Sequence, residues 1–266
     1  MDVSVIIPCY NSGAYLREAL DSVVSAPVRV SFEIIVVDDG STDEQTIALL
    51  KQLEQEGMTI IYQENKGPAA ARNTGVRAST GKYLLFLDSD NKIVPAYMEK
   101  GVAAFGADKR LGVVYGQPSF FGDTDEPRFT TGPFDAAKLL GENYIDMCAM
   151  VRRKLWEDTG GLDESRFLIG HEDWEFWISA MLKKWKFLFI EERLFNYRVL
   201  SDSLITSAYD FKTFENKIFY IYSKNIKNKQ LKKLVLKNRS MGFYLILFKI
   251  NKRLFFNVLF NKIIVK

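Results

Sequence analysis

The stretch LLFLDSD, residues 84–90, runs four apolar residues directly into two carboxylates. A short apolar run bounded by polar residues is typical of a buried strand. The run Phe32–Val37 ends in the same way, at DDG (residues 38–40), and Val3–Ile7 ends at PCYN (residues 8–11). Polar residues that follow several strands point to the carboxyl edge of a parallel sheet, where ligands bind in open α/β folds.

Helical patterns separate these apolar runs. Leu16–Val24, a segment that begins near residue 41, and Ala69–Ala78 have the spacing of amphipathic helices. Ser41 and Glu44 stand three residues apart before the second of them, which is the pattern of a capping box. We therefore predict an α/β fold, with a mostly parallel central sheet and helices on both faces.

The second half of the chain is less regular. After about residue 110 it is rich in aromatic residues, and 187–190 and 194–197 read as two further strands. Residues 211–266 read as a basic helical extension that is rich in aromatics. We expect one domain over 1–205, which changes character near residue 110, and an extension over 206–266.

Composition excludes several kinds of protein. The chain has 266 residues, one His and two Cys, so it cannot hold a multi-histidine zinc centre or a disulfide framework. Its 36 basic and 33 acidic residues are unevenly placed. Residues 211–266 carry fourteen Lys and Arg against one acid, a balance of 14 − 1 = +13, which leaves the first 210 residues at 22 − 32 = −10.

This asymmetry predicts a membrane-associated protein. The N-terminal run lacks the basic start of a secretory signal, and no stretch reaches the about 18 apolar residues of a spanning helix. We expect a cytoplasmic protein whose segment 211–266 contacts the inner face of the plasma membrane. The alternative is that these apolar residues pack on the catalytic domain or on a second subunit, which leaves a homodimer open. No motif supports a nucleic-acid partner.

Two groups of residues are candidates for nucleotide binding. Tyr10, beside Pro8 and Asn11, could stack on a flat ligand, although alone the motif is more typical of a turn with a packing aromatic. Asp38 and Asp39 would repel each other unless hydrogen bonds compensate them. One could accept from a base or ribose, and the other could be held by backbone amides.

The remaining candidates are charged. Asp88 and Asp90 would face one ligand if this segment is extended, because alternate residues of a strand point the same way. With diphosphate oxygens they would make the oxygen shell that Mg²⁺ or Mn²⁺ prefers. Lys66 and Arg72 flank the small residues GPAAA (67–71) and could offset phosphate charge, and a solvated helix face is the alternative for Arg72.

Glu172 and Asp173 precede an apolar helical face formed by Trp174, Trp177 and Met181. A carboxylate at this position could take a proton from an acceptor hydroxyl. The alternative is an ordinary acidic first turn, which favours the helix dipole.

Together, in this order, VIIPCYN (5–11), VDDGSTD (37–43), GPAAARN (67–73), GKYLLFLDSD (81–90) and EDW (172–174) resemble the motifs of the family 2 glycosyltransferases of the GT-A fold. The resemblance is dense over residues 1–95 and patchier to about 205. It implies an inverting, metal-dependent transfer of a sugar from a nucleotide diphosphate, such as a UDP-sugar, to a glycan or lipid-linked glycan in polysaccharide biosynthesis.

The resemblance also implies that 1–205 is the catalytic domain, with a nucleotide-sugar half (1–110) and an acceptor half (111–205). It implies roles for individual residues as well. Pro8, Tyr10, Asn11, Asp38, Asp39, Lys66, Arg72 and Asp88 fall at nucleotide-binding positions. Asp88 and Asp90 fall at the Asp-x-Asp metal motif, and Asp173 falls at the catalytic base, with Glu172 beside it.

The sequence departs from the family pattern at two positions. Asn91 stands where members often carry an acid, and Leu200 stands where many carry a histidine near the metal. A Mg²⁺-dependent phosphoryl-transfer enzyme and a non-catalytic sugar or nucleotide binder therefore stay open as alternatives.

Overall fold

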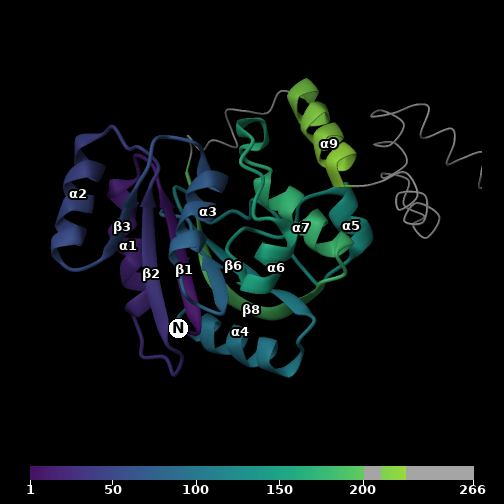
Figure 1. Cartoon of the computed structure of the whole chain (residues 1–266), viewed down its shortest axis with the longest axis horizontal. Coiled ribbons are helices and arrows are strands. Elements are labelled where there is room, and N and C mark those ends of the chain that lie inside the picture. The colour runs from purple at the N-terminus through teal and green to yellow at the C-terminus, as the bar shows by residue number, and fades with distance from the viewer. Residues whose placement is uncertain (201–210, 226–266) are drawn as a thin grey trace, which may run out of the picture.

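We describe a computed structural model of the chain, which places residues 1–200 and 211–225 (Figure 1). Its elements follow one another as β1 (Val3–Cys9), α1 (Gly13–Val24), β2 (Phe32–Asp38), α2 (Glu44–Gln55), β3 (Thr59–Tyr62), α3 (Pro68–Ala78), β4 (Tyr83–Phe86), β5 (Lys92–Ile93), α4 (Ala96–Ala107), β6 (Leu111–Gly122), α5 (Ala136–Gly141), β7 (Met150–Arg152), α6 (Arg153–Thr159), the 3-10 helix η1 (Arg166–Leu168), α7 (Glu172–Leu182), β8 (Lys186–Val199) and α9 (Phe211–Asn225).

The strands form one sheet in the order β3-β2-β1-β4-β7-β6-β8-β5. The first four pair in parallel, as the apolar runs predict. β7 lies antiparallel to both of its neighbours, β6 and β8 are parallel, and β5 closes the edge antiparallel to β8. The ends of β1, β2 and β4 therefore open on one edge of the sheet, where the motif residues lie.

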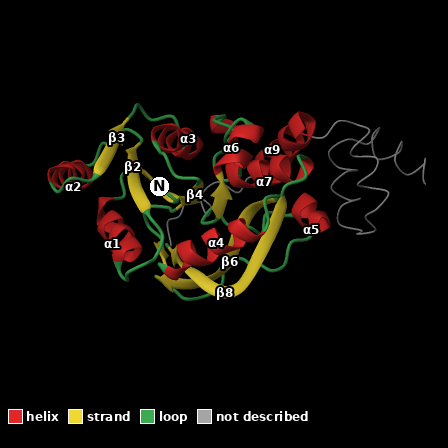
Figure 2. Cartoon of the chain, turned by 60° about the horizontal axis from the view of Figure 1, so that its bottom comes forward, coloured by secondary structure: helices red, strands yellow, loops and turns green. Residues whose placement is uncertain are grey.

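Helices cover both faces of the sheet (Figure 2). One core cluster joins the sheet to α3, α5, α6, α7 and α9, and the other joins it to α1, α2 and α4. Alternate residues of β1 serve the two clusters: Ile6 faces the first, and Val5 and Ile7 face the second. All three are fully buried, and each such side chain contributes about 1.5–3 kcal/mol to stability.

A glycine sets the distance between α3 and the sheet. A Cβ on Gly75 would lie 2.5 Å from Cγ2 of Ile6, so only glycine lets the helix backbone pack this closely on β1. This contact fixes the helix that carries Arg72.

Three local predictions need correction. The cap of α2 is Asp43, whose side chain accepts from Thr46 N at 2.8 Å, and not Ser41. The segments 187–190 and 194–197 belong to one bent strand, β8, with register shifts against β6. Asp88 and Asp90 lie in a turn closed by Asn91 N–H donating to Asp88 O, and not on an extended strand.

The first part of the basic extension docks on the body of the protein. α9 is helical, as predicted, but Ile218, Ile221 and Tyr222 are buried in the core cluster that includes α7. The Tyr222 hydroxyl donates to Leu140 O. For 211–225 the packing alternative therefore holds, while the rest of the predicted extension, 226–266, lies outside the described residues.

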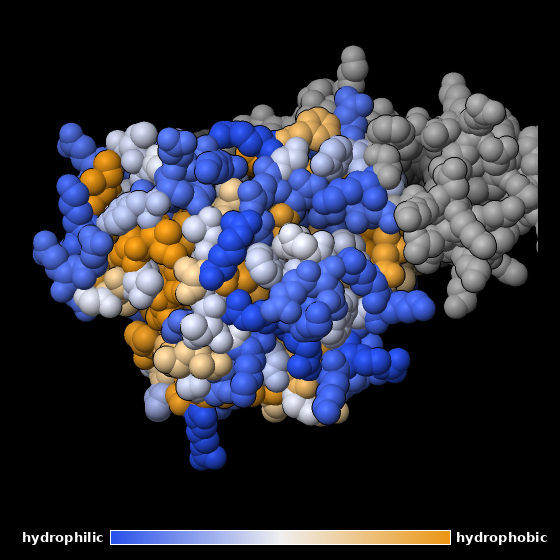
Figure 3. Space-filling view, in the orientation of Figure 1, coloured by the Kyte–Doolittle hydropathy of each residue, from blue (hydrophilic) through white to orange (hydrophobic). Residues whose placement is uncertain are grey.

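The surface of the described part is mainly hydrophilic on the face of Figure 3, with hydrophobic residues gathered over β2 and β3. Among the described helices, none is long and apolar enough to cross a membrane.

Candidate functional site

Arg72 lies at the centre of the candidate site. Arg72 lies on α3, and its side chain is buried. The guanidinium donates to Asp88 Oδ1 at 2.6 Å and to Glu172 Oε1 at 2.9 Å. Burial works against the charged guanidinium, but the two carboxylates outweigh it and raise the pKa of Arg72. Its Nε is buried and has no hydrogen-bond partner within residues 1–200 and 211–225. A buried donor of this kind is costly unless a ligand accepts from it, and an anionic oxygen would do so.

Acidic side chains surround this cation. Burial, and then the charge of Asp88, raises the pKa of Asp90 to about 6. The same two causes raise the pKa of Asp146 to about 8. Burial, and then the charge of Glu172, raises the pKa of Asp173 to about 7. A cluster of carboxyl groups that resist ionisation is typical of a site that receives a cation or moves a proton.

The first turn of α7 separates its two carboxyl groups. Glu172 uses both oxygens, because Oε1 accepts from Arg72 and Oε2 accepts from Gly170 N at 2.7 Å. Asp173 accepts from Trp174 N and from Asn143 Nδ2, both at 2.7 Å. Asp173 is therefore oriented by neutral donors, and in the part of the chain that the structure describes it has no ion-pair partner.

The turn after β2 is tied to the start of α3. Asp39 Oδ1 accepts from Gln63 Nε2 and Lys66 N, and Asp39 Oδ2 accepts from Gly67 N at 2.8 Å. Gly67 has φ of +94°, a conformation that suits glycine and directs this N–H. Asp39 is buried and holds this loop in place, so any contact with a nucleotide would be added to these three hydrogen bonds.

A shallow depression lies beside this loop. It is lined by residues from the start of α3 and from the segment around η1, and these include Lys66, Arg166 and Glu172. Basic and acidic side chains therefore line the same part of the surface.

The loop after β1 forms the other side of the edge. Asn11 accepts from Thr42 N and Asp43 N and donates to Thr42 Oγ1, which ties this loop to the one after β2. Asp38 accepts from Ser41 N within the same turn. Tyr10 is 49% exposed, so its ring is available to a ligand, and it directly follows β1, whose last two residues are Pro8 and Cys9.

The two departures from the family pattern have a structural setting. Asn91 is buried, and its Oδ1 accepts from Arg198 N at 2.8 Å. Arg198 Nε donates to Asp90 O at 2.8 Å. Asn91 therefore pins the metal-motif turn to β8, while Leu200 follows the end of that strand.

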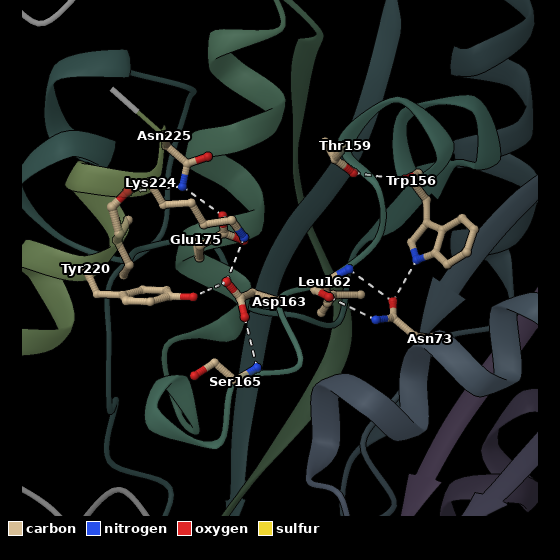
Figure 4. A network of polar contacts seen from close by, with 11 residues as sticks. Asn73, Trp156, Thr159, Leu162, Asp163, Ser165, Glu175, Tyr220, Lys224 and Asn225 are labelled. Carbon is tan, nitrogen blue, oxygen red and sulfur yellow. Dashed lines mark hydrogen bonds and ion pairs between the residues drawn. The ribbon is translucent and has the colours of Figure 1, made fainter. Parts of the chain in front are cut away.

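A second network supports the segment that leads to η1 (Figure 4). Asn73 of α3 binds Leu162 through both amide atoms and accepts from Trp156 Nε1. Asp163 accepts from the Tyr220 hydroxyl and from Lys224 Nζ of α9, and Lys224 also pairs with buried Glu175. The chain that leads to η1 is thus held by α3 on one side and by α9 on the other.

The structure brings five of the predicted residues into one cluster: Arg72, Asp88, Asp90, Glu172 and Asp173. The other predicted residues lie at the carboxyl ends of β1 and β2 or on the adjoining loops: Pro8 and Asp38 on the strands, and Tyr10, Asn11, Asp39 and Lys66 on the loops.

Sequence reasoning missed Asn143 and Asp146, and it did not assign Tyr197 to the cluster. Burial, and then the charges of Asp146, Asp88, Asp90 and Asp173, raises the pKa of Tyr197, so this phenol lies within electrostatic range of the acids. A usable signal was present for Asp146. It interrupts the otherwise apolar run 144–151, and a single acidic residue in a run that is expected to be buried indicates a specific role.

Asp88 and Asp90 are the residues that fit a divalent cation. Asp90 has a second carboxylate beside it and a raised pKa, which a cation would relieve. Within residues 1–200 and 211–225, no group of three or more acidic, His or Cys side chains is arranged to hold a metal ion. The remaining ligands would therefore be oxygens of a ligand and water.

A family model, curated relatives and solved structures match this chain. The family model described as "Glycosyl transferase family 2" matches residues 4–167. An uncharacterised glycosyltransferase of Haemophilus influenzae is 30% identical over 67% of this chain and 71% of its own length. Glycosyltransferase GlyA of Streptococcus pneumoniae is 40% identical over 118 residues, which are 42% of this chain but only 17% of GlyA.

Solved structures share the fold. The structure of TarS (residues 1–349) from S. aureus in complex with UDP-GlcNAc aligns with a TM-score of 0.68 and 21% identity, over 99% of this chain and 81% of that one. The mannosyltransferase PcManGT from Pyrobaculum calidifontis, in complex with GDP-Man and Mn²⁺, aligns with a TM-score of 0.63 and 18% identity, over 99% and 75%. These are GT-A folds, and the expected fold class is confirmed.

Proposed function

The chain belongs to glycosyl transferase family 2, and from this premise we propose that it is an inverting, metal-assisted hexosyltransferase. The donor is a nucleotide diphosphate sugar, and a UDP-sugar is the first choice. The acceptor is a hydroxyl of a glycan or a lipid-linked glycan in polysaccharide biosynthesis. TarS holds UDP-GlcNAc and PcManGT holds GDP-Man with Mn²⁺, which supports a nucleotide-sugar donor for this chain.

The observation that carries the proposal is the buried Arg72 between Asp88 and Glu172, with its free Nε. A diphosphate oxygen that accepts from Nε would satisfy the donor and gain a charged partner. Asp88 and Asp90 would hold Mn²⁺ or Mg²⁺ beside it. The cation would supply stabilisation of the negative charge that develops on the leaving diphosphate.

Asp173 is proposed as the general base. A pKa of about 7 suits it to accept a proton near neutral pH. As the acceptor oxygen bonds to the anomeric carbon, the bond from that carbon to the phosphate oxygen breaks and the hydroxyl proton passes to Asp173. The nucleoside diphosphate leaves with the bonding electrons, and one displacement inverts the anomeric centre.

The nucleoside is proposed to lie along the edge formed by Tyr10, Asp39 and Lys66. Tyr10 is exposed enough to stack on a base. Asp39 retains acceptor capacity beyond its three protein hydrogen bonds, and Lys66 lines the depression beside which phosphate charge would lie.

The test is nucleotide release from a panel of UDP- and GDP-sugars, with and without Mn²⁺. We expect release from at least one donor, and we expect Asp90→Ala to abolish turnover. Asp39→Ala should mainly weaken nucleotide binding. Nucleotide that binds without any release would indicate a non-catalytic binder, and phosphate release from simple phosphoesters would indicate phosphoryl transfer.

A further inference from the structure

Asn143 lies in the segment between α5 and β7 and contacts Asp173, the proposed general base. Asn143 Nδ2 donates to Asp173 Oδ2 at 2.7 Å. This orientation of the amide suits the ionised form of Asp173, because the flipped amide would set an oxygen against a carboxylate oxygen. Asn143 therefore holds one oxygen of Asp173, while Trp174 N holds the other.

The other atom of the same amide has no partner. Asn143 Oδ1 is buried and accepts no hydrogen bond among the described residues. A buried carbonyl oxygen without a donor is destabilising, and such atoms in native proteins call for an explanation. This acceptor belongs to the same amide group whose Nδ2 binds Asp173, the carboxylate that is proposed to remove the proton of the incoming hydroxyl.

We infer that Asn143 is a positioning residue for the transfer: its N–H orients Asp173, and its Oδ1 accepts a hydrogen bond from an O–H of the incoming acceptor other than the one that reacts. The reacting O–H gives its proton to Asp173, so the donor to Asn143 Oδ1 is a second hydroxyl of a glycan acceptor or, when water is the acceptor, its second O–H. This inference rests on the proposed role of Asp173 as the base.

The charges around Asp173 come from several elements. Glu172 precedes it on α7, Arg72 lies on α3, Asp146 lies on the segment that carries Asn143, and Tyr197 lies on β8. Asn143 is the neutral donor from outside α7 that favours the ionised form of Asp173. Its removal should therefore raise the pKa of Asp173.

Two variants separate the two roles of the amide. Asn143→Ala removes both the donor and the acceptor. Asn143→Asp keeps an acceptor oxygen but replaces the donor with a like charge. The control is Glu142→Gln, an exposed neighbour whose ion pair with Lys138 lies outside the site.

The first readout needs no substrate. Carbon-13 NMR of labelled aspartate carboxyls, with Asp173 assigned by Asp173→Asn, follows its titration in the free protein. We expect the pKa of Asp173 to rise by about one unit in Asn143→Ala, to rise further in Asn143→Asp, and to stay unchanged in Glu142→Gln. An unchanged titration in both Asn143 variants would overturn the orienting role, whether or not the enzyme turns over.

The second readout is the pH profile of UDP release from UDP-GlcNAc with water as the acceptor, or of GDP release if GDP-mannose is the donor used. We expect the acid limb to move to higher pH in both variants. At high pH the plateau should fall about tenfold in Asn143→Ala, which lacks the acceptor oxygen, and should fall less in Asn143→Asp. Equal plateaus in wild type and Asn143→Ala would overturn the acceptor-binding role.

Failure of the proposed function would look different from either result. A wild-type protein that releases no nucleotide from any donor, but whose Asp173 still responds to Asn143→Ala, contradicts the transferase mechanism and leaves the Asn143–Asp173 coupling measured. Release from wild type with an unaltered profile in Asn143→Ala contradicts the present inference alone.

Discussion

At the scale of single residues, Glu172 and Asp173 carry the same functional group in different surroundings. Glu172 is paired with buried Arg72 and with a backbone N–H, so its oxygens are already occupied by charged and neutral donors. Asp173 has neutral donors only, and burial raises its pKa to about 7. This difference favours Asp173 as the residue that can both hold and release a proton.

Replacement of Asp173 tests that assignment. Asp173→Asn should lose roughly 10²–10⁴-fold in single-turnover transfer, because a positioned base contributes about that much. Nucleotide affinity, measured by titration calorimetry, should stay close to that of wild type. The matched variant Glu172→Gln keeps a side chain that can accept from Arg72 and should lose less in the transfer step. Full activity in Asp173→Asn would move the base elsewhere.

Asp146 makes stability depend on pH. Burial, and then Asp88, raises its pKa from 3.8 to about 8, so between these values the folded state keeps a proton that the unfolded chain has released. Each such proton lowers the free energy of unfolding by up to about 1.4 kcal/mol per pH unit as pH rises through this window. Below pH 3.8 the effect vanishes, and above about 8 it levels off.

Asp146→Asn should remove this pH dependence, because asparagine keeps an oxygen for Cys148 N and cannot ionise. Urea unfolding in EDTA at pH 5, 6, 7 and 8 should show the variant gaining on wild type as pH rises. The control is exposed Asp125→Asn, which should track wild type. A gain that is the same at every pH would contradict the assignment.

The residues that sequence reasoning found share a property that the missed ones lack. Asp88, Asp90 and Asp173 stand at the ends of apolar runs or at a helix start, so local pattern marks them. Asn143 lies in an irregular segment, and its contact with Asp173 spans 30 residues. Only the path of the chain between α5 and β7 brings the two together, and no local pattern encodes that path.

At the scale of elements, α9 is where the sequence prediction and the structure differ most. A helix rich in basic and aromatic residues is predicted to contact a membrane surface when only its net charge is considered. The buried side of α9 includes Ile218 and Ile221. In addition, Lys217 Nζ donates to Ile169 O beside η1. Charge count alone cannot distinguish a helix that packs on one side from one that projects, because the lysines are compatible with both.

Loss of packing under α9 should be measurable. Ile221→Ala should lower the free energy of unfolding by about 2–4 kcal/mol, because it removes a fully buried side chain from the core cluster. Asn216→Ala, at an exposed position of the same helix, should stay within about 0.5 kcal/mol of wild type. Equal stability of the two variants in urea would show that α9 contributes little to the fold.

The strands were easier to predict than their connections. Three continuous apolar runs identified β1, β2 and β4 as strands of a parallel sheet, because strands buried on both faces need apolar residues throughout. The mixed half from β5 to β8 depends on pairings such as β6 with β8, which begin 75 residues apart at Leu111 and Lys186. Such distant pairings leave no periodic trace in the sequence.

At the scale of the whole molecule, a boundary at residue 205 between the catalytic domain and the extension stays a proposal. It would assign α9 to the extension, although α9 packs in the core. The extension begins with a helix that completes the core, so a truncation at 210 would remove a structural element along with the tail. A cut after Asn225 keeps every described element. It also isolates the segment 226–266, which carries eleven basic residues and no acidic residue.

We propose that residues 226–266 bind an anionic membrane surface. Basic residues near an anionic leaflet contribute about 1 kcal/mol each, and the segment also supplies aromatic residues such as Phe255 and Phe256 for the interface. A lipid-linked acceptor would give such binding a purpose.

Co-sedimentation with phosphatidylglycerol vesicles should recover the full chain at low salt and lose much of it at 500 mM salt, because the attraction is screened. The fragment 1–225 should stay in solution under both conditions, and phosphatidylcholine vesicles should bind neither protein strongly. Circular dichroism on the fragment confirms that it is folded. If 1–225 sediments as well as the full chain, or if the full chain ignores anionic vesicles at low salt, the segment serves another partner and its charge is simply solvated.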